Sequence, residues 1–215
     1  MSAMAPSIVA ALDLSLSNCR SRLAPNHWPI GNKPMLAHDF DCQPNLCGST
    51  LRLKPLADSD FVCMYQAAAD PDIWAGHPAK DRYKCEVFEV YFASLLATKK
   101  ALAVIDIESG EIVGTSSYYA PPDLPDSIAI GFTFLVRAKW GGNSNRELKR
   151  LMVEHAFKAH EIVYFHIAPS NTRSQKATMK LGAVHLYDAE LKISTAPASA
   201  KCYGLTRAQW EASRG

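Results

Sequence analysis

The sequence lacks several features that would assign it to a specialised class of protein. No apolar run approaches the roughly 20 residues that a membrane-spanning helix needs, so we expect no membrane partner. The sequence also has no large excess of positive or negative charge, because 23 Lys and Arg against 21 Asp and Glu leave a formal net charge of +2. A globally basic nucleic-acid binder is therefore not expected. The 215 residues, 48% of them hydrophobic, are enough for one folded domain with a substantial core.

The six cysteines are scattered and include no C-x-x-C pair. Cys42 and Cys47 could pair or share a metal ion, yet His27 and His38 do not complete a usual zinc spacing, so we expect no metal. The apolar run 8–12 is short and is preceded by neither Lys nor Arg, which argues against a secretory signal. Free thiols and a cytoplasmic location are the resulting expectations.

Residues 1–47 contain several prolines and no sustained period, and we interpret them as a partly irregular N-terminal extension. The domain is expected to span residues 48–215, where strand and helix patterns alternate. Asp58 or Ser59 is a candidate cap for the first helix. Strands are expected at 50–56, 101–107, 112–120, 128–136, 162–168, 184–187 and 201–205, and helices at about 59–69, 81–98, 144–159 and 171–181. The helix at 81–98 is expected to present an apolar stripe made of Val87, Val90, Tyr91, Ser94, Leu95 and Thr98.

The clearest strand is 128–136, which is apolar at every second position and should lie in the centre of the sheet. A polar loop, 137–143, and a core-facing helix follow it, and the apolar strand 162–168 comes next. Residues 128–168 therefore predict a β-α-β unit with parallel strands. A strand, a polar loop and a helix N-terminus together are compatible with phosphate binding.

The small net charge conceals an uneven distribution. Residues 137–180 contain nine basic and three acidic residues, a net of +6, so the rest of the chain carries −4. Two solvated helix faces would explain this pattern. A site for a small polyanion would explain it as well, because helix N-termini already favour phosphate. A long nucleic acid would need interleaved aromatic residues, which these helices mostly lack.

Five segments, in order along the chain, carry a resemblance to a known family. The loop at 140–147 lacks the glycine and lysine pattern of ATP-binding and dinucleotide-binding loops. Together with the other segments it resembles the acyl-CoA loop of the GNAT superfamily of N-acetyltransferases, in the RimJ/RimL-type branch. The segments are Leu51-Arg52-Leu53-Lys54-Pro55-Leu56, Asp70-Pro71-Asp72-Ile73-Trp74 with His77-Pro78, Ile130-Gly131-Phe132-Thr133-Phe134-Leu135, Trp140-Gly141-Gly142-Asn143-Ser144-Asn145-Arg146-Glu147, and Asn171-Thr172-Arg173-Ser174 with Leu181-Gly182-Ala183.

The resemblance implies an α+β fold in which a central mixed sheet, splayed at the CoA site, is flanked by helices. It implies acetyl-CoA as acyl donor and no metal. A backbone N–H near Phe134 or Leu135 would polarise the thioester carbonyl. Asn143 stands where the family has a further glycine, and Asn tolerates a left-handed backbone. The implied cofactor-binding residues are Phe134, Leu135, Val136, Arg137, Trp140, Gly141, Gly142, Asn143, Ser144, Asn145, Asn171 and Arg173.

The resemblance also suggests catalytic and acceptor-binding residues. Ser174 is the implied acid for the thiolate, although it could instead tighten its helix. Relatives often have a glutamate just before the Ile-Gly pair, and this chain has Ala129 there, so either water carries the proton or another residue serves. His166 is one candidate base, unless it is a satisfied core histidine. Trp74 and His77 are expected to contact substrate, while Trp74 could also be a core residue.

The function expected from these observations is N-acetyl transfer to an amine-bearing acceptor, either a protein N-terminus or a small molecule. A catalytically silent acyl-CoA sensor or interaction module is the alternative, because Ala129 and Asn143 depart from the family pattern. We expect no nucleic acid partner, and a homodimer is compatible with the family.

Overall fold

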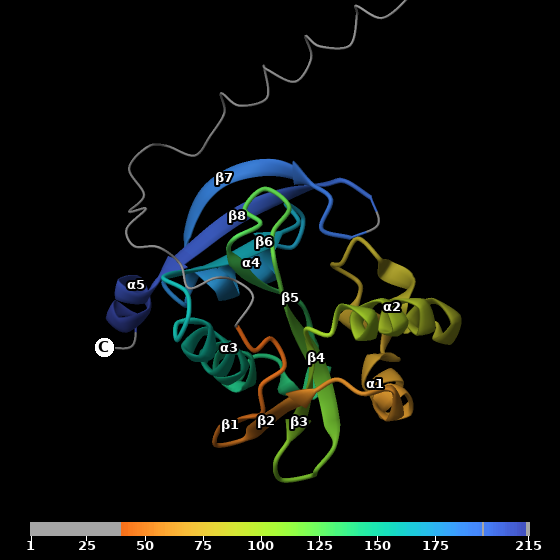
Figure 1. Ribbon diagram of the computed structural model, residues 1–215. Helices are drawn as coiled ribbons and strands as arrows, with labels where there is room; N and C mark the ends of the chain where they lie inside the picture. The colour runs from red at the N-terminus through yellow and green to blue at the C-terminus, as the bar shows by residue number, and fades with distance from the viewer. Residues whose placement is uncertain (1–39, 195, 214–215) are drawn as a thin grey trace, which may run out of the picture. The chain divides into compact units, whose positions relative to one another are not determined.

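The structure of the protein is a computed structural model that describes residues 40–194 and 196–213. These residues lie in one compact unit built on an eight-stranded sheet with the order β1-β2-β3-β4-β5-β6-β8-β7 (Figure 1). Neighbouring strands pair antiparallel, except for β5 and β6, which are parallel. The mixed α+β fold and the parallel β-α-β unit predicted from the sequence are confirmed.

The elements follow the predicted order, with two longer final strands. A short first strand and a C-terminal helix were not predicted. The strands are β1 (Leu46–Cys47), β2 (Leu51–Pro55), β3 (Ala101–Asp106), β4 (Ile112–Tyr119), β5 (Ile128–Leu135), β6 (Ile162–Ile167), β7 (Val184–Leu191) and β8 (Ala198–Thr206). The α-helices are α1 (Phe61–Ala68), α2 (Cys85–Thr98), α3 (Ser144–Ala156), α4 (Thr172–Met179) and α5 (Arg207–Ala212). Short 3-10 turns are η1 (Asp58–Asp60), η2 (Pro71–Ile73), η3 (Lys80–Tyr83) and η4 (Arg137–Lys139).

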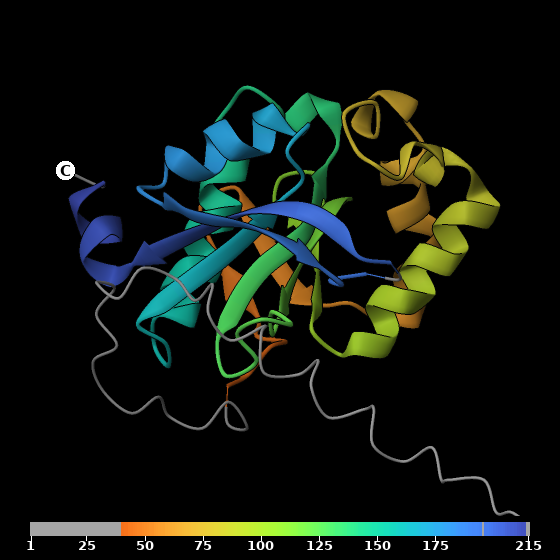
Figure 2. The same cartoon turned by 90° about the horizontal axis from the view of Figure 1, so that it is seen from above.

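The sheet separates two apolar cores. Helices α1 and α2 cover one face, and α3 lies on the other with α4 and α5 (Figure 2). Strand β3 shows the division, because Leu102 and Val104 belong to the core under α3, whereas Ala101 and Ala103 belong to the core under α1 and α2. Alternate residues of a strand point to opposite faces, so a strand buried on both sides is apolar throughout.

Strand β5 changes face half-way along its length. Ile128 and Ile130 join the core under α3, but Phe132 and Phe134 pack in the core under α1 and α2. A regular strand would keep all four side chains on one face, because they are two residues apart. The apolar residues that alternate along β5 in the sequence are therefore divided between the two cores.

A β-bulge produces the change. Thr115 of β4 pairs with Phe134, whereas Ser117 pairs with Gly131, so one β4 residue faces two residues of β5. Phe132, one of these two, has a φ of +52°, which is the left-handed region that a bulky residue rarely adopts. One extra residue in a strand inverts the alternation beyond it and bends the strand.

Beyond the bulge, β5 leaves its parallel neighbour. Only Ile128 and Ala129 of β5 pair with β6, opposite Val163 and Tyr164. The other edge of β5 stays paired with β4 as far as Leu135. A gap therefore opens between the carboxyl end of β5 and β6, and the loop that leads into α3 starts beside it.

Two local predictions are wrong. Neither Asp58 nor Ser59 caps the first helix; the Asp60 carboxylate accepts from the Ala57 N–H at 3.0 Å and from Lys54. The apolar stripe predicted for α2 is displaced, because Val90 is 71% exposed. Tyr91 and Leu95 are buried as predicted, and Phe88 and Phe92 complete the buried face of α2.

The N-terminal extension predicted for residues 1–47 lies largely outside the described residues. From residue 40 onward, Phe40, Cys42 and Leu46 pack against the core under α3. The cysteines within the described ranges are free thiols. None of the helices described for this chain is long and apolar enough to cross a membrane.

Candidate active site

A cavity of about 320 Å³ lies where β5 separates from β6. Three chain segments and one side chain form its walls: residues 72–77 before α2, residues 133–135 at the end of β5, Trp140, and residues 170–173 at the start of α4. Segments far apart in the sequence thus converge at the open edge of one strand. The cavity includes Trp74, His77, Phe134, Leu135, Trp140, Asn171 and Arg173 from the set of residues predicted for the site.

The backbone of Leu135 faces this opening. The N–H of the next residue, Val136, donates to the Val113 carbonyl of β4 at 2.9 Å. Successive residues of a strand direct their N–H and C=O groups to opposite edges, so those of Leu135 point away from β4. The Trp140 Nε1–H donates to the Leu135 carbonyl at 2.8 Å. The Leu135 N–H is therefore aimed at the cavity as a potential donor.

Trp140 connects the loop to helix α4. Its indole is tied to β5 through the Leu135 carbonyl, and the Arg173 guanidinium lies 3.7 Å above its ring. Asn171 caps α4, because its side-chain oxygen accepts from the Ser174 N–H at 3.1 Å. Ser174 itself is half-buried and does not line the cavity. The acid role suggested for Ser174 stays a prediction.

The loop before α3 has its left-handed residue at Gly141, with a φ of +72°. Asn143 is right-handed, with a φ of −84°, so the left-handed backbone considered for Asn143 is not adopted. A Cβ added at Gly141 or Gly142 would meet no atom within 4 Å. This open backbone, followed by Ser144 and Asn145 in the first turn of α3, fits a phosphate-bearing ligand that approaches closely.

Part of the predicted basic cluster is neutralised. Arg137 forms ion pairs with Asp70 and, at 2.7 Å, with Asp72, and Lys139 pairs with Asp106. The pKa of the Asp70 carboxyl is lowered, chiefly because the backbone N–H of Asp72 donates a hydrogen bond to it. The pKa of the Asp106 carboxyl is also lowered, chiefly by the hydrogen bond from Lys139. Arg137 and Lys139, the first two basic residues of the loop, thus attach it to neighbouring segments through ion pairs.

Trp74 and His77 form one wall of the cavity. Trp74 is only 2% exposed, and its Nε1–H donates to the Ala68 carbonyl at 2.8 Å. It is therefore a core residue that also lines the cavity, and its contact with substrate stays a prediction. Burial, and then the charge of Arg82, lower the pKa of His77 to about 4, so the ring is neutral at pH 7.

His166, the candidate base, is not among the residues that line the cavity. It lies on β6 with its Nδ1 atom 2.7 Å from the Tyr119 hydroxyl. Burial lowers its pKa. Its role as the base stays a prediction.

Lys149 was counted in the sequence only as one of the basic residues of α3. In the structure it is 8% exposed, and its Nζ donates to the Thr133 hydroxyl at 2.8 Å. Thr133 lines the cavity, and its hydroxyl lies 2.7 Å from that of Ser116. Burial lowers the pKa of Lys149 to about 7. No ion pair of Lys149 occurs among the described residues. The spacing of Lys149, one turn before the apolar Met152 and Val153 on the same helix face, was the available signal in the sequence.

Comparison with known proteins identifies the family. The family model described as "Acetyltransferase (GNAT) domain" matches residues 50–184, more than half of the chain. The chain belongs to the GNAT acetyltransferase family. It is therefore an N-acetyltransferase, and acetyl-CoA is the co-substrate supported by the fold. No protein of curated function matches the sequence.

Three solved structures illustrate the likeness of this GNAT domain to others. A GCN5-related N-acetyltransferase from Brucella melitensis has a TM-score of 0.68 at 15% identity, covering 80% of this chain and 82% of that one. The aminoglycoside acetyltransferase AAC(6')-Ib, in complex with coenzyme A and kanamycin, has a TM-score of 0.60 at 20% identity, covering 77% and 100%. Mycobacterium smegmatis RimJ, in complex with CoA-disulfide, has a TM-score of 0.53 at 16% identity, covering 74% and 83%. At these identities the likeness shows the fold.

Glu147 anchors the first turn of α3 to the turn between β1 and β2. Its carboxylate accepts from the Ser49 hydroxyl and the Thr50 N–H, both at 3.0 Å, and also from the Ser49 N–H and the Thr50 hydroxyl. Burial acts to raise the pKa of Glu147, but these hydrogen bonds outweigh it and the pKa is lowered. Gly48 leaves room for the carboxylate, because a Cβ there would lie 2.1 Å from it.

Substitution of this carboxylate tests the anchor. Since the pKa of Glu147 is lower in the folded state, its contribution is present above the unfolded pKa and is lost as the pH falls through the folded pKa. We expect Glu147→Gln to lower the free energy of unfolding at pH 7 by about 1–3 kcal/mol. In denaturant titrations at decreasing pH, the free energies of unfolding of the variant and the wild type should become equal at the acid end of the range. Glu86→Gln, an exposed substitution on α2, should change little at any pH, and equal stability of Glu147→Gln and wild type at pH 7 would contradict the anchor.

Proposed function

We propose that this N-acetyltransferase transfers the acetyl group to a primary amine of a protein N-terminus or a small molecule, in the manner of the RimJ/RimL-type branch, and that it works in the cytoplasm. The observation that carries the proposal is the cavity at the splayed edge of β5, where the Leu135 N–H and the segment 72–77 meet. The ordered motifs, and the RimJ and aminoglycoside acetyltransferase structures, support the branch and the amine class.

Acetyl-CoA supplies an activated thioester, and the protein has to polarise its carbonyl and remove a proton from the attacking amine. The Leu135 N–H is the donor aimed at the cavity, and a fixed donor at this position would stabilise developing negative charge on the carbonyl oxygen. Asn171 and Arg173 at the start of α4, with the open loop at 141–142, are the groups that we assign to CoA. Trp74 and His77 wall the side that we assign to the acceptor.

We also propose that Lys149 accepts the amine proton. The Thr133 hydroxyl lies between the cavity and Lys149 Nζ, so a proton from the acceptor can pass to Thr133 as Thr133 gives its own to Nζ. A neutral lysine is required for this step, and burial without a counter-ion favours that form. An α-amine titrates near ~8 and a lysine side chain near ~10.4, so a base of pKa about 7 is better matched to an N-terminus.

Turnover with a panel of amines tests the proposed function. We expect release of free thiol when the protein is mixed with acetyl-CoA and N-terminal peptides, polyamines or amino sugars. Arg173→Ala should raise the KM for acetyl-CoA roughly tenfold, because a stacked cation beside the cavity is lost. Lys176→Ala, an exposed change on the same helix, should leave it unaltered. Binding of acetyl-CoA without thiol release from any amine would contradict the amine acceptor.

Lys149→Met tests the proton acceptor. We expect kcat/KM to fall by about 10²–10⁴-fold, the usual contribution of a general base. The decline of the wild-type rate below pH 7 should disappear from the residual activity, while acetyl-CoA binding is retained. Lys158→Met, an exposed change just beyond α3, is the matched control. An unaltered rate and pH profile in Lys149→Met would exclude this role.

The same variant has a consequence for stability that does not depend on the acceptor. Because the pKa of Lys149 is lower in the folded state, the unfolded chain binds more protons between about pH 7 and pH 10. The penalty of the buried lysine is therefore complete below this window and is relieved as the pH rises. Thermal unfolding should show Lys149→Met more stable than wild type at pH 7, with a smaller gain at pH 10.

A further inference from the structure

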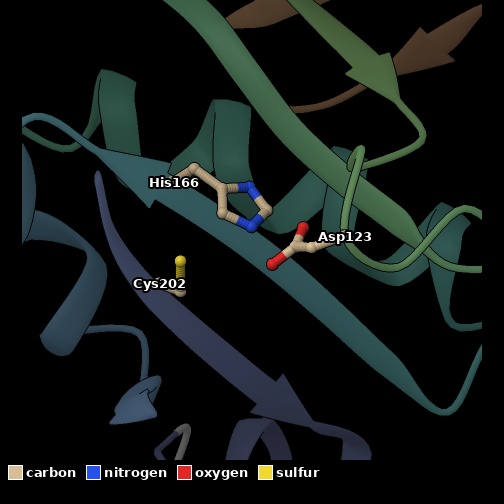
Figure 3. A group of neighbouring side chains, drawn as sticks. All are labelled: Asp123, His166 and Cys202. Carbon is tan, nitrogen blue, oxygen red and sulfur yellow. The ribbon is translucent and has the colours of Figure 1, made fainter. Parts of the chain in front are cut away.

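Three side chains from distant parts of the sequence converge on the part of the sheet formed by β6 and β8. Asp123 comes from the loop between β4 and β5, His166 from β6 and Cys202 from β8. One potential ligand atom of each lies within 4.8 Å of those of the other two. Figure 3 shows the imidazole, the carboxylate and the thiol directed toward one another. None of the three lines the acetyl-transfer cavity.

Two tyrosines form hydrogen bonds with two members of this group and orient their side chains. The Tyr119 hydroxyl lies 2.7 Å from His166 Nδ1, and the Tyr187 hydroxyl donates to Asp123 Oδ2 at 2.6 Å. Each bond occupies one polar atom of the side chain and leaves the other, His166 Nε2 or Asp123 Oδ1, for a further partner. Hydrogen bonds of this kind commonly orient the ligands of metal ions.

His166 Nε2 is the atom that most needs a partner. It is buried, and it forms no hydrogen bond with any residue that the structure describes. A buried polar atom without a partner costs free energy. When Nδ1 carries the proton and donates to Tyr119, Nε2 presents a lone pair toward the thiol and the carboxylate.

The arrangement does not fit a nucleophilic triad. In such a triad the two nitrogens of the histidine bind different partners, the acid on one side and the nucleophile on the other. Here Nδ1 is occupied by Tyr119, and Asp123 and Cys202 share the side of Nε2. Cys202 is fully buried, and burial raises the pKa of its thiol to about 12. A thiol in this setting is not a nucleophile, but a cation beside it would favour the thiolate.

We propose that Asp123, His166 and Cys202 form a binding site for a divalent transition-metal ion, with zinc as the best-matched class. Imidazole nitrogen, thiolate sulfur and carboxylate oxygen are the three ligand types that zinc takes in proteins. Tetrahedral zinc with bonds of about 2.0–2.3 Å places its ligand atoms roughly 3.3–3.8 Å apart. The three atoms lie within 4.8 Å of one another, so each pair needs to approach by no more than about 1.0–1.5 Å, and Asp123 is on an exposed loop that can supply the movement.

Three protein ligands leave a fourth position of a tetrahedral ion for water or another ligand. Asp123 is exposed, whereas Cys202 is fully buried, so the open position faces the surface on the Asp123 side. These three residues form no recognisable metal-binding spacing in the sequence, because consecutive members are 43 and 36 residues apart. Strand pairing brings two of them together, since His166 is opposite Cys202 in the β6–β8 ladder.

Cobalt(II) titration of the metal-free full chain under reducing conditions tests the proposal. We expect one Co²⁺ per chain, with a thiolate-to-cobalt charge-transfer band and the visible bands of a tetrahedral ion, displaced by one equivalent of Zn²⁺. Cys202→Ser should lose the charge-transfer band. Asp123→Asn, at an exposed position, should weaken Co²⁺ binding at least tenfold, and Tyr187→Phe should weaken it about 10–100-fold through loss of orientation.

Two matched variants control for other metal-binding groups in the chain. Cys63→Ser removes an exposed cysteine, and His185→Asn removes the histidine of an exposed His185–Asp188 pair. Both should bind Co²⁺ as the wild type does. Absence of the charge-transfer band in the wild type, or its persistence in Cys202→Ser, would overturn the site. Unchanged affinity in Asp123→Asn would overturn the three-ligand arrangement.

Discussion

The bulge in β5 is the constraint on which the active site depends. By placing two residues of β5 opposite one residue of β4, it turns the second half of the strand over and bends it away from β6. This geometry requires a left-handed backbone at Phe132, a conformation that costs free energy in a residue with a bulky side chain. The fold supports it from both sides, because the Tyr91 hydroxyl donates to the Phe132 carbonyl at 3.3 Å and the Phe132 ring packs on Tyr119. The gap, the cavity and the inward-facing Leu135 N–H all follow from the same distortion.

The buried lysine belongs to the same local structure. Thr133 is the second residue of the bulge, and its hydroxyl joins Lys149 on α3 to Ser116 on β4. A lysine without an anionic partner destabilises a core, and a protein that keeps one there gives up stability at that position. The Thr133 hydroxyl lies between Lys149 Nζ and the cavity, and this position links the destabilising lysine to the chemistry of an attacking amine. Strain and desolvation are thus concentrated within a few residues of the reacting groups.

Sequence reasoning was most successful where a pattern is local. The order of strands and helices and the parallel β5–β6 pair each depend on residues close together in the chain. It failed where the outcome depends on packing between distant segments. Val90 was assigned to the core because its spacing matched a helical stripe, but the neighbouring Phe88 and Phe92 are larger and occupy that face instead. The sequence distinguishes Lys149 only as one of the nine basic residues of 137–180, and the convergence of Asp123, His166 and Cys202 is invisible without the strand register.

The central claim is that the splayed edge of β5 receives the thioester. A crystal structure with a non-reactive thioether analogue of acetyl-CoA is the most direct test. The analogue's carbonyl oxygen should lie within hydrogen-bond distance of the Leu135 N–H, with the pantetheine arm between β5 and β6 and the pyrophosphate on the loop at 141–145. An analogue bound elsewhere, for example in the separate hollow lined by Thr50, Asp106 and Lys139, would contradict the claim.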